Sequence, residues 1–260
     1  MSWKLIKSIQ QKEADLRLIL PFGLNLRLGD VISVDKNGTF TLEGSLATVL
    51  GMSAGTPRTA SPSSVNLTLQ NGKDTQCEFR SAGTASSTFE NLPKASAGID
   101  ISFGSAEGWI LAITGRAIHS LEEVNQFRQR ILDAYSRGVW KADWAMVTSI
   151  STVEAMTLLA ARNADTKIAL TIAGEVKESS TLEAKLTAGI SIMATNKEIT
   201  QCVISQRMPA FCSAIRVRDQ WWSTPGFGTL AVGPAVARNF DEATHEDFWE
   251  GVDEAIPGSK

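Results

Sequence analysis

Every second residue is apolar in several stretches of this chain. The clearest stretch lies between residues 186 and 194, where one set of alternate positions holds Leu186, Ala188, Ile190, Ile192 and Ala194. The other set holds Thr187, Gly189, Ser191 and Met193. Because successive side chains of a β-strand point to opposite faces, a period of two predicts a strand with one apolar face.

Three further stretches show the same alternation. Their apolar positions are Val65, Leu67 and Leu69; Ile99, Ile101 and Phe103; and Ile168, Leu170 and Ile172. Such strands suit a sheet with one face on a core and the other in water, or a membrane barrel with one face in lipid and the other in a lumen. The alternation is compatible with both settings, and choosing between them is the functional question.

Two stretches have the periodicity of amphipathic helices. The first runs from about Ser2 to Leu16, with Leu5, Ile6 and Ile9 on one side. Its basic residues are Lys4, Lys7 and Lys12, which would meet a membrane surface or water. The second runs from Leu121 to Tyr135, where Ser120 and Glu123 match a capping box and Gly138 can end the helix.

The rest of the chain up to about residue 210 predicts strands and loops. Two long strand-prone stretches, Ala145 to Val176 and Leu182 to Arg207, are joined by a short polar connection, Lys177 to Thr181, which is typical of a hairpin. The stretches 53–64 and 81–93 are rich in Ser, Thr, Ala, Gly and Pro, and we expect them to be loops.

The C-terminal region differs from the rest in composition. An uncharged run from Gln220 to Ala237 contains two prolines and three glycines and predicts a linker. A helix is expected from about Asp241 to Ala255, with an apolar stripe, ending before Pro257. Residues 239–260 hold seven acids and one base, whereas the preceding 238 residues hold 24 bases and 21 acids. This acidic segment is either a detachable plug on a cationic body or a solvated tail.

The bulk composition predicts a folded intracellular protein. The chain has 260 residues, of which 43% are hydrophobic and 20% charged, and its net charge is −3. The first eleven residues lack the apolar region of a secretory signal, so we expect a cytosolic protein. The cysteines, Cys77, Cys202 and Cys212, have neither CxxC spacing nor nearby histidines, so neither a disulfide framework nor a zinc site is predicted.

The sequence does not predict an enzyme. Its two histidines are His119 and His245, and it contains no GxSxG, Walker A, GxGxxG or HExxH motif. We therefore assign no catalytic, cofactor-binding or metal-binding residue. Nucleic acid is not an expected partner either, because Arg216 and Arg218 beside Trp221 and Trp222 are the nearest approach to a basic patch with interleaved aromatics.

The order of these features resembles the pore-forming domain of the gasdermins, most closely the short bacterial and fungal members. The resemblance rests on the basic first helix, on Leu28-Gly29-Asp30 and Leu42-Glu43-Gly44-Ser45-Leu46 within residues 21–51, and on three C-terminal motifs. These motifs are Ile131-Leu132-Asp133-Ala134-Tyr135, Trp144-Ala145-Met146-Val147-Thr148-Ser149 and Arg207-Met208-Pro209-Ala210-Phe211. The resemblance spans most of the chain.

The resemblance implies an α+β fold in which helices surround a twisted antiparallel β-sheet that can refold into a transmembrane β-barrel. It implies a pore-forming domain at 1–224, a linker with the cleavage region at 225–239, and an autoinhibitory helix at 240–260. After an activating protease removes that helix, the protein would form a homo-oligomer in anionic membrane lipids and cause cell death in antiviral or incompatibility-type defence. It would be cytoplasmic when inactive and lie in the cell's inner membrane when active, with no cofactor.

The resemblance also implies roles for particular residues. The inhibitory contacts would be Phe240, Phe248, Trp249, Val252 and Ile256, the cleavage region Thr229 to Asn239, and the basic membrane-facing residues Lys4, Lys7 and Lys12. Many bacterial members carry a lipidated cysteine near the start, but the first cysteine here is Cys77, so that feature does not carry over.

Two alternatives remain open. The first is a soluble α+β binding or assembly module, such as a phage or secretion-system component, whose last helix completes the core. The second is an enzyme with an unrecognised site, which would show a closed polar pocket containing His119 or a carboxylate pair.

Overall fold

The computed structural model describes residues 5, 8–9, 17–35, 38–55, 57–59, 65–71, 75–89, 92, 97–172, 180–187, 190–217 and 240–242. The chain forms two compact units. Unit 1 is Met1–Glu13, Ser61–Ile118 and Ser151–Ala210, and unit 2 is Ala14–Ala60, His119–Ile150 and Phe211–Lys260. The expected domain boundaries at 224 and 239 lie outside the described residues.

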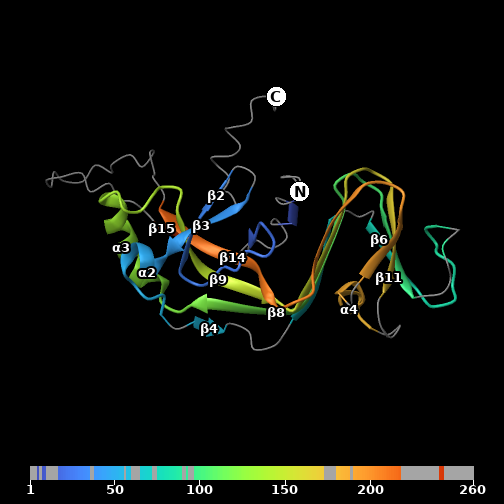
Figure 1. The fold of residues 1–260 in the computed structure, drawn as a ribbon, viewed down its shortest axis with the longest axis horizontal. Helices are drawn as coiled ribbons and strands as arrows, with labels where there is room; N and C mark the ends of the chain where they lie inside the picture. The colour runs from blue at the N-terminus through green and yellow to red at the C-terminus, as the bar shows by residue number, and fades with distance from the viewer. Residues whose placement is uncertain are drawn as a thin grey trace, which may run out of the picture. The chain divides into compact units, whose positions relative to one another are not determined.

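Unit 1 contains four strands of an antiparallel 11-stranded sheet, which we call the first sheet of this unit, and a separate antiparallel sheet of four strands. Figure 1 shows both sheets. The first sheet has the order β5 (Val65–Asn71), β8 (Trp109–Leu121, up to Ile118 in this unit), β10 (Ala155–Ala161) and β13 (Ile199–Ile204). The second has the order β6 (Thr75–Arg80), β7 (Gly98–Phe103), β11 (Thr166–Ile172) and β12 (Ile190–Thr195). Helix α4 (Leu182–Thr187) precedes β12.

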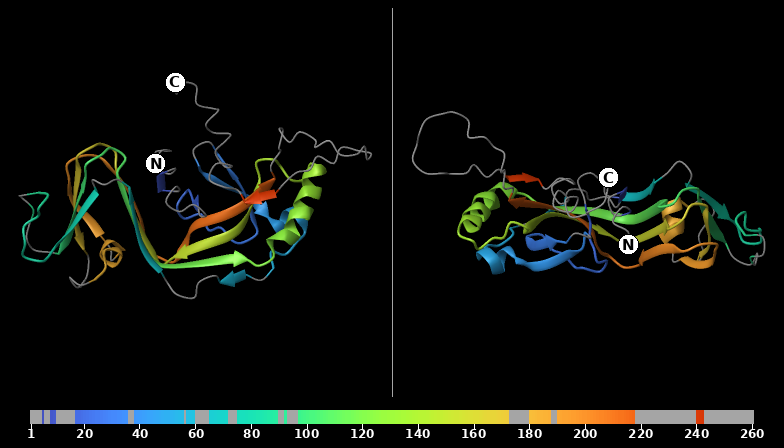
Figure 2. Two further views of the ribbon diagram at one scale, coloured as in Figure 1. Left: turned by 180° about the vertical axis from the view of Figure 1, so that it is seen from behind. Right: turned by 90° about the horizontal axis from the view of Figure 1, so that it is seen from above.

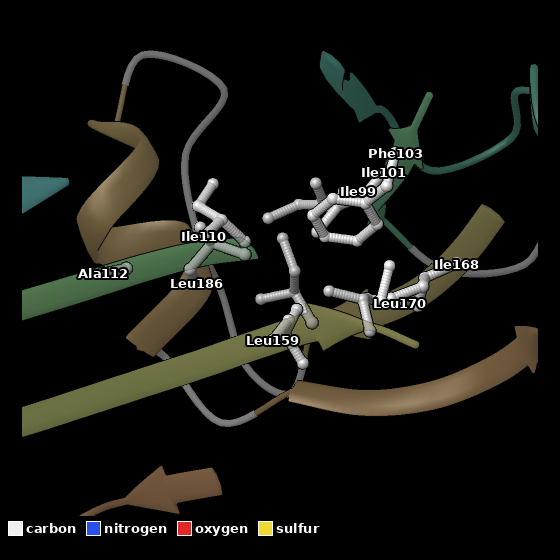
Figure 3. Close-up of a cluster of buried hydrophobic side chains, with 11 residues drawn as sticks. Ile99, Ile101, Phe103, Ile110, Ala112, Leu159, Ile168, Leu170 and Leu186 are labelled. Carbon is white, nitrogen blue, oxygen red and sulfur yellow. The ribbon is translucent and has the colours of Figure 1, made fainter. Parts of the chain in front are cut away.

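The two sheets of unit 1 share a hydrophobic core, which we call core 1 (Figure 3). Its buried members are Ile99, Ile101, Phe103, Ile110, Ala112, Leu159, Ala161, Ile168, Leu170, Ile172 and Leu186. Cys77, Phe79, Ile190 and Ile192 pack against them and are partly buried. All but Leu186 of the buried members come from strands, so one sheet forms the cover of the other.

Unit 2 combines strands with two helices. Its elements are β1 (Arg17–Leu18), β2 (Asp30–Val34), β3 (Phe40–Ser45), α2 (Leu46–Leu50), β4 (Pro57–Thr59), α3 (Val124–Ser136), β9 (Ala145–Val153), β14 (Met208–Val217) and β15 (Phe240–Glu242). β2 pairs with β3 and β9, β4 pairs with the end of β8, and β14 pairs with β1, β9 and β15.

A second hydrophobic core, core 2, lies in unit 2 and is closed by a helix. Helix α3 turns Phe127, Ile131 and Ala134 inward, at the three- and four-residue spacing of one helix face. Trp140 is 2% exposed and packs edge-on against Trp144, with ring centroids 5.8 Å apart. Core 2 is therefore an ordinary helix-on-sheet core.

The sequence predicted several elements correctly. Strands occur at the three alternating stretches 65–69, 99–103 and 168–172, and the stretch Ala145 to Val176 holds β9, β10 and β11. Helix α3 and its left-handed Gly138, at φ 75°, are also confirmed. The result is a sheet-rich fold with two antiparallel sheets and surrounding helices, compatible with the α+β class.

Three local predictions were wrong. Residues 182–187 form helix α4, so the strand expected from Leu186 begins only at Ile190. Leu121 ends β8 and Ser120 hydrogen-bonds Ser149 (Oγ to Oγ, 2.9 Å), so helix α3 starts at Val124 without a capping box. The loop expected at 53–64 contains β4, which pairs with the end of β8.

Candidate functional site

Four segments of the chain each supply one strand to both sheets of unit 1. We call them segment A (65–80, β5 and β6), segment B (98–114, β7 and the first part of β8), segment C (155–172, β10 and β11) and segment D (190–204, β12 and β13). The neighbour order is A, B, C, D in both sheets. Each segment therefore folds once, and it keeps the same neighbours on both sides of its fold.

The alternation of residue types continues through the fold of segment A. Its odd positions hold Val65, Leu67, Leu69, Asn71, Lys73, Thr75, Cys77 and Phe79. Its even positions hold Asn66, Thr68, Gln70, Gly72, Asp74, Gln76, Glu78 and Arg80. The even set has no apolar side chain in either half, so one phase of alternation runs through two strands that lie in different sheets.

Segments B and C show the same continuity. The apolar phase of segment B is odd and includes Ile99, Ile101, Phe103, Trp109, Leu111 and Ile113. The apolar phase of segment C is even and includes Met156, Leu158, Ala160, Ile168, Leu170 and Ile172. Segment D follows the pattern in β12 with Ile190 and Ile192 but departs from it in β13, where Ile199 and Val203 fall on the other phase.

Core 1 takes opposite phases from the two sheets. In segment B, it takes Ile99 and Ile101 from the odd phase of β7 but Ile110 and Ala112 from the even phase of β8. In segment C, it takes Ile168 and Leu170 from the even phase and Leu159 and Ala161 from the odd phase. The strands β8 and β10 are therefore apolar on both phases. The phase that faces away from core 1 is buried as well, because Trp109, Leu111, Ile113, Met156 and Leu158 are each 0% exposed.

A buried charge pair lies on the polar phase of the second sheet. Arg80 is 4% exposed and Asp100 is 3% exposed, and Arg80 Nε lies 4.0 Å from Asp100 Oδ1. Arg80 Nη2 also donates a hydrogen bond of 3.2 Å to the carbonyl oxygen of Leu170. Such a pair contributes little net stability unless its remaining polar atoms are hydrogen-bonded.

The segment after β6 folds back to bind this carboxylate. Asp100 Oδ2 accepts hydrogen bonds from Ser86 Oγ (2.5 Å), Ser87 N (2.8 Å), Ser87 Oγ (3.2 Å) and Thr88 N (3.4 Å). The loop expected at 81–93 is confirmed over residues 81–89, but its role in covering Asp100 was missed. The available signal was the run of hydroxyl side chains from Ser81 to Thr88 directly after Arg80.

Helix α4 is fastened to both sheets of unit 1. Glu183 Oε1 accepts a hydrogen bond of 2.7 Å from Thr68 Oγ1 of β5, and the Leu186 carbonyl accepts one of 2.8 Å from Thr157 Oγ1 of β10. Lys185 Nζ lies 4.0 Å from the ring centroid of Phe79 in β6, a cation–π distance. Moving α4 would therefore break two hydrogen bonds to the first sheet and a cation–π contact to the second.

The pKa of Glu183 is lowered from its ordinary value. Partial burial works to raise the pKa, but hydrogen bonds from the Thr68 hydroxyl, its own backbone amide and the Thr181 hydroxyl outweigh that effect. The contact with Thr68 therefore favours the carboxylate form.

Few residues of the first predicted helix are described. Leu5, Ser8 and Ile9 are helical, Leu5 and Ile9 are buried, and Ser8 Oγ accepts a hydrogen bond of 3.0 Å from Trp109 Nε1 of β8. These positions agree with the apolar side expected for Leu5 and Ile9. The basic residues expected to face a membrane, Lys4, Lys7 and Lys12, lie outside the described residues.

One edge of β14 in unit 2 is shared by two distant segments. β1 pairs with its first half, with Arg17 opposite Cys212, and β15 pairs with its last residues, with Phe240 opposite Val217 and Asp241 opposite Arg216 (Figure 2). The C-terminal segment is thus a strand added to a sheet edge.

β15 corrects the C-terminal prediction. Asp241 and Glu242 belong to a strand rather than to the first turn of the expected helix. Of the five expected inhibitory contacts, Phe240 lies in β15, at the register position opposite Val217. The other four, Phe248, Trp249, Val252 and Ile256, lie outside the described residues. The period of the apolar stripe gave no sign of a three-residue strand, because edge pairing depends on the partner strand.

The thiols and His119 do not form a reactive centre. Burial raises the pKa of Cys77 and of Cys202 to about 11 and that of Cys212 to about 12, which keeps them protonated near neutral pH. His119 Nδ1 lies 3.2 Å from Thr59 Oγ1 at an exposed position. Across the described ranges, no group of three or more His, Cys, Asp or Glu side chains could hold a metal ion.

Within the part of the chain that the structure describes, no helix has both the length and the apolar character needed to span a membrane. No protein-family model matches the chain, and no curated protein matches it.

Proposed function

We propose that the chain is an autoinhibited pore former of the kind that its resemblance to the gasdermins implies. In this proposal, release of the C-terminal segment lets segments A to D straighten, insert into an anionic membrane and pair with those of neighbouring copies. The function is permeabilisation of the membrane and, through it, cell death. The chain itself carries out no chemical reaction.

The observation that carries the proposal is the apolar phase that continues through the folds of segments A, B and C and through β12 of segment D. If each fold were straightened, the order A, B, C, D would give one sheet with longer strands. Its apolar phase would lie on one face, and the other face would be polar or small except at Ile110, Leu159, Met193, Ile199 and Val203. Such a two-faced sheet suits lipid on one side and water on the other.

The positions of the charged residues in the apolar phase indicate how deeply the strands would enter the membrane. They are Lys73, Glu107, Arg162 and Glu198, and all four lie in the short connections between the strands of segments A to D. Arg162 Nη1 and Glu198 Oε2 are 3.0 Å apart, with side chains 59% and 77% exposed. In the proposed state the connections would lie at the membrane surface, where charges are tolerated, and the strands of the second sheet would enter the lipid.

The crossing strands must then extend beyond the present second sheet. A crossing strand needs about 9 to 11 residues. On segment D the pattern itself extends, because Leu182, Ala184, Leu186 and Ala188 continue the phase of Ile190. Leu182 and Leu186 are also four residues apart, which suits one face of a helix. The sequence of α4 is therefore compatible with the helix observed and with a strand that lengthens β12.

The edge of β14 gives the C-terminal segment an inhibitory role. An unpaired strand edge is a template for pairing with another chain. β15 covers the last residues of that edge and sets Asp241 opposite Arg216. In the proposal, cutting between Val217 and Phe240 turns β15 from a tethered strand into a free peptide. Three paired residues hold such a peptide only at the high effective concentration that the linker provides.

The test is dye release from liposomes. We would insert a protease site near Arg238 and compare intact and cut protein on vesicles with and without anionic lipid. The matched control carries the same residues in scrambled order and is treated with the same protease. Release that requires both the cut and anionic lipid supports the proposal. A folded, cut protein that releases no dye on several lipid mixtures would favour the binding or assembly module, whose tail only completes a sheet.

A further inference from the structure

The inner pair of segments keeps one register through its fold. Trp109 faces Ala160 in the first sheet, and Phe103 faces Thr166 in the second. Trp109 lies six residues after Phe103, and Thr166 lies six residues after Ala160. Ala161 also donates a hydrogen bond of 2.8 Å to the Gly108 carbonyl at the fold. Segments B and C thus form a single bent ladder that could straighten without any change of partners.

The outer pairs do not keep their register. Between segments A and B, Asn71 faces Trp109 and Thr75 faces Phe103, so A advances four residues while B advances six. Between segments C and D, Ala161 faces Ile199 and Ile168 faces Thr195, so C advances seven residues while D advances four, and a register shift between Ala169 and Leu170 follows. At the fold, segment A is thus two residues shorter than segment B, and segment D is three residues shorter than segment C.

A shift of two residues preserves the faces of a strand, whereas a shift of one would invert them. A slide by two along the A–B pair therefore keeps apolar residues with apolar residues. It also changes the charges that meet on the second sheet. At present Glu78 lies directly opposite Asp100, an unfavourable like-charge pair. Continuing the register of the first sheet, nine residues along both strands from Asn71 and Trp109, would instead bring Arg80 opposite Asp100.

We propose that, when the segments straighten, the inner pair B–C keeps its register while the outer segment A slides by two residues against B. This inference rests on the proposed function. It adds that the folded unit stores a register offset, and that the slide exchanges a like-charge pair for an opposite-charge pair at Asp100. The Ser86–Thr88 contacts to Asp100 must open for the slide to occur.

Pairs of engineered disulfides can test which segments keep their register and which change it. Directly opposite strand residues have Cα separations of about 4.5 to 5.5 Å, within the range that a disulfide spans. In a protein lacking its three natural cysteines, the inner double staple is Thr114→Cys with Ala155→Cys plus Ser102→Cys with Lys167→Cys. The outer double staple is Thr68→Cys with Ala112→Cys plus Gln76→Cys with Ser102→Cys. Each disulfide is also made singly as a control.

All variants are cut near Arg238, and dye release from anionic vesicles is measured before and after reduction. We expect the inner double staple, its two single staples and the single staple of Thr68→Cys with Ala112→Cys to release dye as the reduced proteins do. The single staple of Gln76→Cys with Ser102→Cys and the outer double staple hold Glu78 opposite Asp100, so both should release no more than uncut protein until they are reduced. Dye release by the oxidised outer double staple would overturn the slide. The straightened strands would then have kept both registers, with a bulge that takes up the two-residue difference between them. Loss of dye release in the oxidised inner double staple would also overturn the slide, because the B–C pair is expected to keep its register. If reduced, cut protein releases no dye at all, the proposed function itself fails.

Discussion

Core 2 is closed by a helix, whereas core 1 is closed by a second sheet. In unit 2, α3 covers the strands with Phe127, Ile131 and Ala134. In unit 1, strands cover strands, and α4 contributes only Leu186 to the buried set. A helix satisfies its own backbone hydrogen bonds, but a strand can exchange partners with neighbouring strands. In the proposed function, unit 2 is therefore the scaffold that keeps its fold and unit 1 is the part that rearranges.

Matched truncations in the two cores give the largest expected effect. Phe103 and Phe127 are each 1% exposed, and replacing either with Ala should lower the free energy of unfolding by about 3–5 kcal/mol. Hydrogen exchange should then rise mainly in unit 1 for Phe103→Ala and mainly in unit 2 for Phe127→Ala. Equal increases in both units for both variants would show that the cores unfold together and would remove the distinction.

Asp100→Asn tests the charge buried in unit 1. The substitution keeps the shape of the side chain but removes the charge that accepts four hydrogen bonds and faces Arg80. Because hydrogen bonds to a charged group contribute about 1.5–3 kcal/mol, we expect a loss in that range by denaturant unfolding. Ser102→Ala on the same strand is the control and should change little. A loss no greater than the control's would mean that the pair has no structural role.

Acidification should act with opposite signs in the two units. The pKa of Glu183 in unit 1 is lowered, so its stabilising contribution is complete above the ordinary value of 4.5 and is lost as pH falls through the folded-state pKa. Burial raises the pKa of Asp30 in unit 2, so this group favours the folded state more as pH falls toward its ordinary value of 3.8.

The comparison is made with two conservative variants. Melting temperatures of Glu183→Gln, Asp30→Asn and the parent are measured from neutral to acidic pH. The difference between Glu183→Gln and the parent should shrink on acidification because the parent loses its advantage. Asp30→Asn should be relatively more stable at neutral pH than in acid. Parallel melting curves for all three proteins would contradict both assignments.

The smallest expected effect concerns the like-charge pair in unit 1. Glu78→Gln removes the acid opposite Asp100, and cross-strand pairs of this kind are worth roughly 0.2–1 kcal/mol. We expect a small gain in the stability of the folded chain, visible as a shift of the denaturant midpoint with unchanged slope. Glu43→Gln on the exposed face of β3 is a control outside unit 1. A loss of stability would mean that Glu78 has a favourable partner.

The strands were predictable where alternation coincides with burial. Ile99, Ile101 and Phe103 lie on core 1 as their spacing predicted. The same rule failed at 182–187, because Leu182 and Leu186 satisfy both a two-residue period and a four-residue helical repeat. Contacts with Thr68, Thr157 and Phe79, which are distant in sequence, select the helix. Periodicity alone cannot decide a segment that fits both patterns.

The candidate site was predictable in part. Alternation identified segments A to D, but their folding into two sheets depends on tertiary pairing that has no local signal. Asp100 alternates with the apolar residues of β7 and is nevertheless buried, because residues 86–88 supply hydrogen-bond donors to its carboxylate. β15 was missed for a related reason. A three-residue strand has no stable pattern of its own and forms only where β14 offers an edge.

The two strands that share the edge of β14 are translated at different times, one before β14 and one after it. β1 pairs with Cys212 and Phe211, and it is made long before β14. β15 is made 22 residues after β14 ends. At about 5–20 residues per second, the half of the edge at Ile215 to Val217 stays without its partner strand for roughly one to five seconds on every ribosome. Crowded nascent chains on one messenger RNA would meet each other in that interval, so translation speed through residues 218–242 should influence how much of the protein matures as a monomer.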